Sequence, residues 1–345
     1  MDSITFRFND LPTELALLIL RYAAQTTFDQ AEKYDKVNCP YSSVLTLCLV
    51  SKNFRRAVLP ALLHTVLLPK PRNVRVFVQA LLTQEAYKQA SSDLHFDYAP
   101  HVHKMWIGLD GGNLTSADLL ADPREYALQP SERPLAINLL TPVMLAASSL
   151  ALGWTSVDLL IECLEHAWES RPATPVNEEH PRLPWNTETL TLSCGDPINR
   201  TKWKCLTDTP QGSAFLASIS HLLSPTYLCR DNPLQVYRLP EWMKTAPLAS
   251  FKSLQTVILP YPCTTPPINL RALVTTGVDM QMHLLTLPAT LLKDPNNGIP
   301  KAIKVFDDII GPGEEATRSD GTRLQVSEVL WCSRSGWEKV WAWML

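Results

Sequence analysis

Glycine is scarce in this chain of 345 residues, with 12 glycines against 28 prolines. Ordinary shares are about 7% for glycine and about 5% for proline, so glycine is depleted and proline enriched. This balance argues against long flexible linkers and favours stiff loops that end helices and strands abruptly. Because 46% of the residues are hydrophobic and 19% are charged, the composition is that of a globular protein and excludes disorder as the overall state.

Long hydrophobic runs are also missing. The longest, Val143–Val157, is interrupted by two serines and a threonine, and it is shorter than the roughly 20 residues that cross a bilayer. The first ten residues include Asp2, Arg7 and Asp10 and lack the continuous apolar core of a signal peptide. We therefore expect no membrane insertion and no secretion, and we expect a cytoplasmic or nuclear location.

Paired cysteine motifs are absent as well. The eight cysteines lie far apart, with no CxxC pair and no spacing typical of a metal site. In a reducing compartment such cysteines are predicted to be reduced and mostly buried thiols. The sequence therefore predicts no cofactor and no metal held by cysteine.

An overall positive charge is lacking too. The formal net charge of −3 does not favour binding to nucleic acid. The stretch from Lys36 to Gln84 nevertheless holds seven basic residues and no Asp or Glu, and −3 minus 7 leaves −10 for the rest of the chain. Such a stretch either attracts an acidic partner or forms a solvated face.

A first short helix is predicted to begin near Pro12. Asp10 is suited to cap it, Pro12 falls in the first turn and Glu14 faces the positive end of the helix dipole. The residues that follow, up to Tyr22, are apolar on nearly all sides of the helix. A helix of this kind must be covered on more than one side.

A second helix is predicted from Val44 to about Leu59, with Pro60 ending it. Leu45 and Leu49 point away from its inner stripe and give it a second apolar face. Two helices of this size cannot bury all of this surface between themselves.

The motifs Leu-Pro-x-Glu-Leu at residues 11–15 and Leu-x-Leu-Val-Ser-Lys-x-Phe-Arg at residues 47–55 resemble the F-box, in the form found in fungal F-box-like proteins. The resemblance covers about residues 9–68 and implies binding to the Skp-family adaptor of a cullin-RING ubiquitin ligase. The usual F-box has a short turn where this chain has an insertion over residues 25–43. The resemblance implies adaptor contacts by Leu11, Pro12, Leu15, Ile19 and Val50, and the unexplained second face adds Leu45 and Leu49.

The rest of the chain repeats the pattern apolar-x-x-apolar-x-apolar, which is typical of short strands. These candidate strands end near Leu67, Ile107, Leu152, Leu192, Leu239, Leu259, Leu287 and Trp331. With Leu259 set aside, the intervals run from 40 to 48 residues. This spacing favours irregular βα units, as in a leucine-rich-repeat-like solenoid with parallel strands.

Residues 143–168 fit two structures. Their apolar residues follow a 4-3 spacing, as in one long helix, but Ser148, Ser149 and Gly153 interrupt it. We favour the alternative in which residues 149–153 form a strand between two helices.

Few residues suggest chemistry. His101 and His103, with Asp97, could approach a metal ion, but no third ligand stands at a recognisable spacing. Cys194 follows a candidate strand without a nucleophile motif, and residues 108–112 fit a turn better than a phosphate-binding loop. The four tryptophans between residues 331 and 343 indicate either a terminal cap over the last repeat or an aromatic ligand site.

Together these observations predict an α/β protein without catalysis of its own. Residues 1–68 are expected to form an F-box-like helical module, and residues 69–345 an irregular region that recognises a protein substrate. The predicted function is the substrate-recognition subunit of an SCF-type cullin-RING ubiquitin ligase, with a Skp-family adaptor and an unknown protein substrate as partners. The alternative is a scaffold outside any ligase, in which the helices serve only as an N-terminal cap.

Overall fold

The fold is that of a computed structural model, which describes residues 11–24, 41–108, 121–122, 126–127, 133–153, 156–171, 183–193, 200–223, 246–262, 280–289, 325–331 and 341. The helices are α1 (Thr13–Ala23), α2 (Ser42–Val50), α3 (Lys52–His64), α4 (Pro71–Gln89), α6 (Arg133–Ala146), α7 (Val157–Glu169), α8 (Arg200–Thr207) and α9 (Pro210–Ser218). Two short 3-10 turns, η2 (Ala99–His101) and η7 (Leu248–Ser250), connect them to strands. None of the helices in these ranges is long and apolar enough to cross a membrane.

One eight-stranded sheet organises the molecule. Its strands are β1 (Thr65–Leu68), β2 (Lys104–Ile107), β5 (Ser149–Gly153), β6 (Thr189–Ser193), β7 (His221–Leu223), β8 (Thr256–Pro262), β9 (Met280–Pro288) and β10 (Gln325–Trp331). They lie side by side in chain order, parallel from β1 to β8 and antiparallel from β8 to β10. A separate two-stranded ribbon pairs β3 (Ala121–Asp122) with β4 (Tyr126–Ala127). The protein is thus α/β with a mostly parallel sheet.

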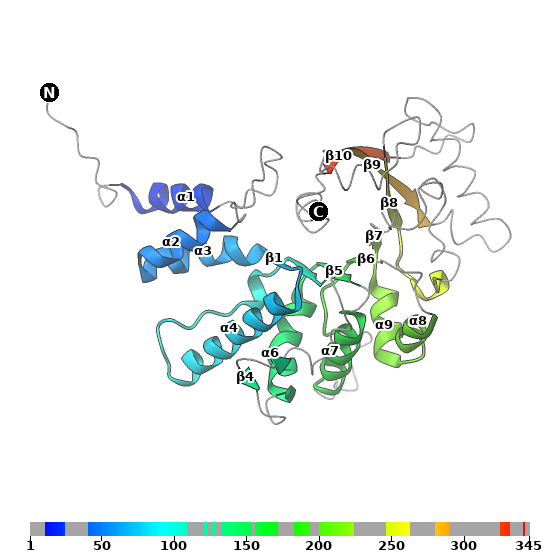
Figure 1. The fold of residues 1–345 in the computed structure, drawn as a ribbon, viewed down its shortest axis with the longest axis horizontal. Helices are drawn as coiled ribbons and strands as arrows, with labels where there is room; N and C mark the ends of the chain where they lie inside the picture. The colour runs from blue at the N-terminus through cyan, green and yellow to red at the C-terminus, as the bar shows by residue number, and fades with distance from the viewer. Residues whose placement is uncertain are drawn as a thin grey trace, which may run out of the picture.

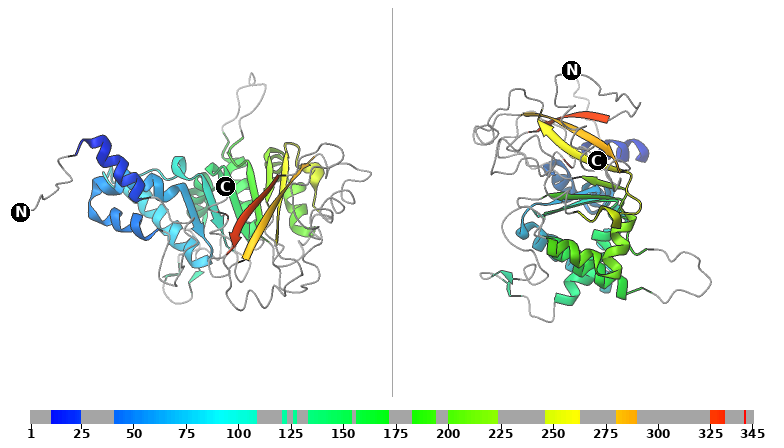
Figure 2. Two further views of the ribbon diagram at one scale, coloured as in Figure 1. Left: turned by 90° about the horizontal axis from the view of Figure 1, so that it is seen from above. Right: turned by 90° about the vertical axis from the view of Figure 1, so that its right-hand side faces the viewer.

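The helices from α4 to α9 lie along one face of the sheet, and β8 to β10 curl over the other side (Figures 1 and 2). Each of the crossovers from β1 to β2, from β2 to β5 and from β6 to β7 contains at least one helix, as a parallel connection requires. The described crossover helices therefore lie on one side of the sheet. We call the opposite face the inner face.

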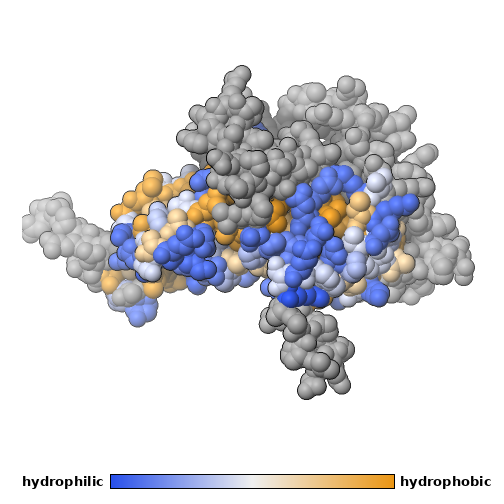
Figure 3. Space-filling model, turned by 90° about the horizontal axis from the view of Figure 1, so that it is seen from below, coloured by the Kyte–Doolittle hydropathy of each residue, from blue (hydrophilic) through white to orange (hydrophobic). Residues whose placement is uncertain are grey.

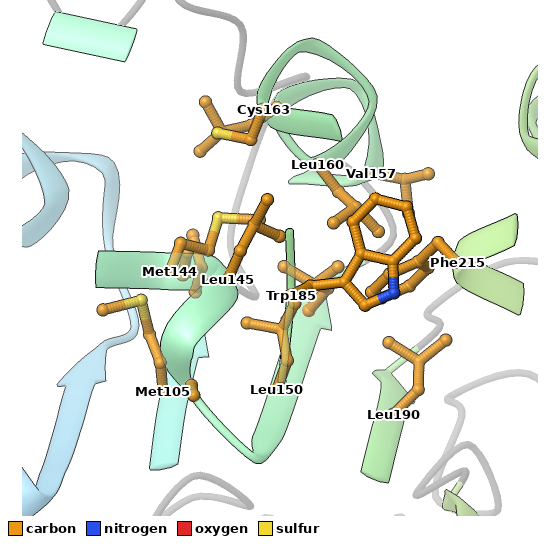
Figure 4. Close-up of a cluster of buried hydrophobic side chains, with 14 of the residues drawn as sticks. Met105, Met144, Leu145, Leu150, Val157, Leu160, Cys163, Trp185, Leu190 and Phe215 are labelled. Carbon is orange, nitrogen blue, oxygen red and sulfur yellow. The ribbon is translucent and has the colours of Figure 1, made fainter. Parts of the chain in front are cut away.

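The core fills the space between the sheet and the helices. Alternate residues of each strand point to the helices, and these residues are aligned by the strand register. The central row of the core is Val66, Met105, Leu150, Leu190, Leu222 and Val257, all buried. Figure 4 shows Leu150 and Leu190 pointing from their strands toward Leu160 of α7 and Trp185.

The segment from α6 to α7 takes the interrupted arrangement that the sequence favoured. All five residues of β5 are buried. Its first residue, Ser149, pairs with Lys104 of β2 on one side and with Thr189 of β6 on the other. A continuous helix would have left the sheet without a strand between β2 and β6. The prediction of a strand over residues 149–153 is confirmed.

The single helix predicted from Val44 to Leu59 is wrong in two respects. First, Ser51 is extended and its hydroxyl accepts a hydrogen bond from the Phe54 amide at 3.2 Å, so it caps a new helix. Second, α3 continues through Pro60 to His64. A proline inside a helix costs about 3 kcal/mol, and burial of Leu59 and Leu63 offsets that cost.

The predicted strand positions are confirmed near Leu67, Ile107, Leu152, Leu192 and Leu259, and strands also lie at Leu287 and Trp331. The one near Leu239 lies outside the described residues. Strand β7 was not predicted, because its three residues are too short to carry the pattern. The expectation of parallel strands holds up to β8 and fails for β9 and β10.

The open edge of the sheet at β1 is covered by Tyr41. Its hydroxyl donates to the Thr65 carbonyl at 2.8 Å and accepts from the Leu67 amide at 3.0 Å. These are backbone groups on the side of β1 that has no neighbouring strand. The Tyr41 side chain, just before α2, therefore supplies hydrogen-bond partners to two backbone groups at an edge that would otherwise be open to pairing with another strand.

Replacing Tyr41 by phenylalanine should lower the free energy of unfolding by about 1–3 kcal/mol, because two partly buried backbone groups lose their partner. Chemical denaturation measures this loss. The matched control is Tyr22→Phe on α1, where the side chain is 64% exposed and no change is expected. Equal stability of wild type and Tyr41→Phe would contradict the edge-covering role.

Candidate protein-docking surface

Helix α1 leaves most of its apolar side chains in solvent. Leu20, and Ala24 just after the end of α1, are buried against Val44 and Val58. On the remaining sides four leucine or isoleucine residues are between 46% and 49% exposed, and Tyr22 is 64% exposed. These exposed leucine and isoleucine residues are Leu15, Leu17, Leu18 and Ile19. The helix thus uses only one narrow stripe for its own core.

Helix α2 behaves in the same way. Its sequence, SSVLTLCLV, contains no charged residue, and its only fully buried residue is Val44. Leu45, Leu49 and Val50 are exposed by 47%, 87% and 60%. Both helices pack on α3, α2 extensively and α1 through a smaller contact.

The exposed residues Leu15, Leu17, Leu18, Ile19 and Tyr22 of α1 and Leu45, Leu49 and Val50 of α2 are called here the N-terminal apolar surface. Figure 3 shows hydrophobic side chains gathered at this end of the molecule. Soluble monomers rarely expose apolar side chains in such number on neighbouring helices, and such surfaces mark interaction sites. Among the other residues whose exposure the structure describes, one further large apolar side chain, Val76, is exposed to this degree.

Five of the seven residues predicted to contact an adaptor belong to this surface, and Leu11 and Pro12 directly precede α1. Of the seven, Pro12, Leu15, Ile19, Leu45, Leu49 and Val50 are exposed, and Leu11 is half-buried. Leu17, Leu18 and Tyr22 were not among the predicted contacts, but they are also exposed on α1. The apolar character of nearly every α1 residue was the signal for them.

The basic stretch beside this surface is engaged within the chain. Lys52 forms an ion pair with Asp93 at 3.0 Å, and Arg56 donates to the Asp93 carbonyl oxygen at 2.7 Å. The hydrogen bond and the positive charge of Lys52 hold the pKa of Asp93 below its usual value. Part of the positive charge noted in the sequence therefore anchors α3 to the loop after α4.

The residues that suggested chemistry are not brought together. His101 stacks on Phe96 and His103 lies against His64, each with ring centroids 4.9 Å apart. Within the described ranges no group of three or more His, Cys, Asp or Glu residues is placed to hold a metal ion. Gly108 ends β2 with φ of +56°, the left-handed region that favours glycine at a turn. Cys194 lies outside the described residues.

Three cysteines are described, and none of them is paired in a disulfide with another described residue. Cys163 is fully buried, and burial raises the pKa of its thiol to about 12. Cys205 is exposed and Cys48 is half-buried. Of the three described cysteines, only Cys163 is therefore buried as predicted.

Cys163 should resist alkylation in the native protein, because reaction needs both access and the thiolate form. Iodoacetamide at pH 8 followed by peptide mass spectrometry is expected to modify Cys205 and leave Cys163 unmodified until denaturant is added. Equal rates at the two cysteines in native buffer would contradict the packing of α7.

The comparisons with known proteins give no relative: no protein-family model, no curated protein and no solved structure matches this chain.

Proposed function

We propose that this protein is the substrate-recognition subunit of an SCF-type cullin-RING ubiquitin ligase, without catalysis of its own. In this proposal α1, α2 and α3 form an F-box-like module that binds a Skp-family adaptor. The single observation that carries it is the N-terminal apolar surface on α1 and α2. The Leu-Pro-x-Glu-Leu motif runs into the first turn of α1, and the Val-Ser-Lys-x-Phe motif joins the end of α2 to the start of α3.

The energetics favour a partner over this surface. Fully burying one leucine side chain contributes about 1.5–3 kcal/mol, and seven of the eight side chains are leucine, isoleucine or valine with 46% or more of their area exposed. A partner that covers them gains several such contributions, less the cost of association. Leu49, 87% exposed, is the side chain with the most to gain.

The remainder of the chain suits substrate recognition. Sequential parallel strands with helices along one face are the arrangement of βα solenoids such as leucine-rich repeats. In that arrangement the helix-free face is the one commonly used for binding. The inner face of this sheet is the corresponding surface, on a region that we propose to be leucine-rich-repeat-like. A cytoplasmic or nuclear location belongs to the same proposal.

A pull-down with a purified Skp-family adaptor tests the proposal. Wild type should be retained, and Pro12→Ala combined with Leu15→Ala should be retained less. Val76→Ala, a change at an exposed apolar residue of α4, serves as the matched control and should behave like wild type. No retention of wild type, or equal retention of all three proteins, would contradict the proposal.

A second candidate function is supported by the edge contacts of the helical module. Helix α3 leads directly into β1, the His64 carbonyl accepts from the His103 amide at 3.1 Å, and Tyr41 covers the β1 edge. In a scaffold outside any ligase, the helical module would serve only as an N-terminal cap that makes these contacts with the sheet. Deleting residues 1–60 would then abolish the cooperative unfolding of the sheet, and wild type would fail to bind the adaptor.

A further inference from the structure

The side of α1 that points away from α2 and α3 carries a regular apolar stripe, at one end of the molecule (Figure 1). Leu20, buried in the core that the three helices share, marks the inner side of α1. With 3.6 residues per turn, Leu15, Leu18 and Tyr22 lie on the opposite side, and all three are exposed. Their spacing of three and four residues is the pattern by which one helix packs along a second helix.

The two flanks of this stripe differ in charge. Glu14 and Arg21 stand on one flank, two helical turns apart, and Pro12 and Ile19 stand on the other flank with the same spacing. All four residues are exposed. Neither Glu14 nor Arg21 forms an ion pair with another described residue. One flank therefore offers one charge of each sign to a partner, and the other flank is apolar.

This arrangement is complementary to itself when the helix is reversed. In an antiparallel pair of α1 helices, Leu15 of one copy lies beside Leu18 of the other, and the two-fold axis makes each contact twice. The same register sets Glu14 of one copy opposite Arg21 of the other, and it brings the two apolar flanks together. A single axis between residues 15 and 18 generates all of these contacts. A parallel pair would instead set Glu14 beside Ile19, without a counter-charge.

The area of this contact predicts a weak dimer. The stripe and its apolar flank contribute four side chains that are 46% to 64% exposed, namely Leu15, Leu18, Ile19 and Tyr22. Each presents on the order of 100 Å². With the stems of the charged flank, two copies bury roughly 1,000 Å² in total, which is at the low end for a specific interface. Such an area fits a reversible dimer with a dissociation constant on the order of 10 µM.

We propose that α1 pairs with α1 of a second copy of this chain, antiparallel about a two-fold axis, so that the free protein is a weak homodimer. A second copy is the occupant because it carries the reversed pattern of charges and apolar residues that the stripe and its flanks require. Leu15 and Ile19 are also proposed adaptor contacts, so dimerisation and adaptor binding exclude each other. Only this regulatory consequence rests on the proposed function.

The test is analytical ultracentrifugation of the full chain at concentrations from about 1 to about 200 µM, which bracket the expected dissociation constant. Glu14→Arg and Arg21→Glu each set like charges opposite each other in both ion pairs, and each should weaken dimerisation at least ten-fold. The two changes in one chain restore opposite charges, and the dissociation constant should return to within three-fold of wild type. A mixture of the two single variants should form heterodimers, because one has two positive residues on this flank and the other has two negative residues.

Leu18→Asp tests the stripe itself and should leave the protein monomeric throughout this concentration range. Val76→Asp, at an exposed apolar residue of α4, is its matched control and should dimerise like wild type. The charge reversals carry the test by themselves if Leu18→Asp fails to fold, since circular dichroism identifies that failure. A wild type that stays monomeric, or a dimer that the single charge reversals do not weaken or that the double reversal does not restore, overturns the proposal.

A Skp-family adaptor is needed only to test the regulatory consequence. Added in excess to the dimer, it should replace the dimer by a one-to-one complex. A complex that still contains two copies of the chain paired through α1 would overturn the mutual exclusion. An adaptor that does not bind at all contradicts the proposed function alone, because the dimer and its charge reversals are measured without it.

Discussion

Changing Leu49 to aspartate should weaken binding of the Skp-family adaptor at least 100-fold, which corresponds to about 2.7 kcal/mol. Leu49 is 87% exposed on α2, so in the proposed complex it inserts into the partner and a charge there would be desolvated without a counter-charge. Because the side chain contributes little to the core of the free protein, its free energy of unfolding should change by less than about 0.5 kcal/mol. Isothermal titration calorimetry and chemical denaturation measure the two quantities.

The matched control is Val76→Asp. Val76 is 63% exposed, but it lies on α4, which packs on the sheet. This change introduces the same charge at an apolar surface position outside the N-terminal apolar surface. Adaptor affinity should stay at the wild-type value. A similar loss of affinity in both variants would indicate a nonspecific charge effect and contradict docking on α2.

Changing Leu150 to alanine should lower the free energy of unfolding by about 2–5 kcal/mol. Leu150 is fully buried at the centre of the core, between Met105 and Leu190 in the strand register (Figure 4). Removal of its branched end leaves a cavity that helices α6 and α7 cannot close without moving. Urea denaturation followed by circular dichroism gives the loss.

Leu49→Ala is the control for this second prediction. It makes the same chemical change at a leucine that is 87% exposed, so no cavity forms and stability should change by less than about 0.5 kcal/mol. Similar losses in the two variants would mean that the sheet does not carry the main core. That result would contradict the fold itself.

The strands could be predicted where the pattern of the sequence is set by the core alone. In β2, β5 and β6 the helix-facing residues are apolar, and proline or glycine stands near many strand ends. Strand β7 has only three residues, which is too few for a periodic pattern. Its place in the sheet depends on neighbours far away in sequence.

Proline was a less reliable guide than its abundance suggested. Pro60 was predicted to end a helix, but α3 passes through it, because Leu59 and Leu63 must reach the core beneath. The boundary between α2 and α3 lies instead at Ser51, whose hydroxyl caps α3 within an otherwise apolar stretch of sequence. A local preference of a few kcal/mol is overridden where burial on both sides is larger.

Of the candidate docking residues, Leu45 and Leu49 were predicted from surplus apolar character, and the other five from the resemblance to the F-box motifs. The contacts of Tyr41 with β1 and of Trp341 with Thr191 could not be predicted in either way. Both join residues that are distant in sequence, 24 and 150 positions apart, and no local pattern encodes such pairs. They follow only from the closure of the whole sheet.

Hydrogen–deuterium exchange of the full chain, alone and with an equimolar Skp-family adaptor, tests the proposed function most directly. The prediction is a one-to-one complex in which amides of α1 and α2 exchange at least ten-fold more slowly than in the free protein, while those of the central strands β2, β5 and β6 are unchanged. Failure to form a complex, or protection of the inner face with no change in α1 and α2, would contradict it.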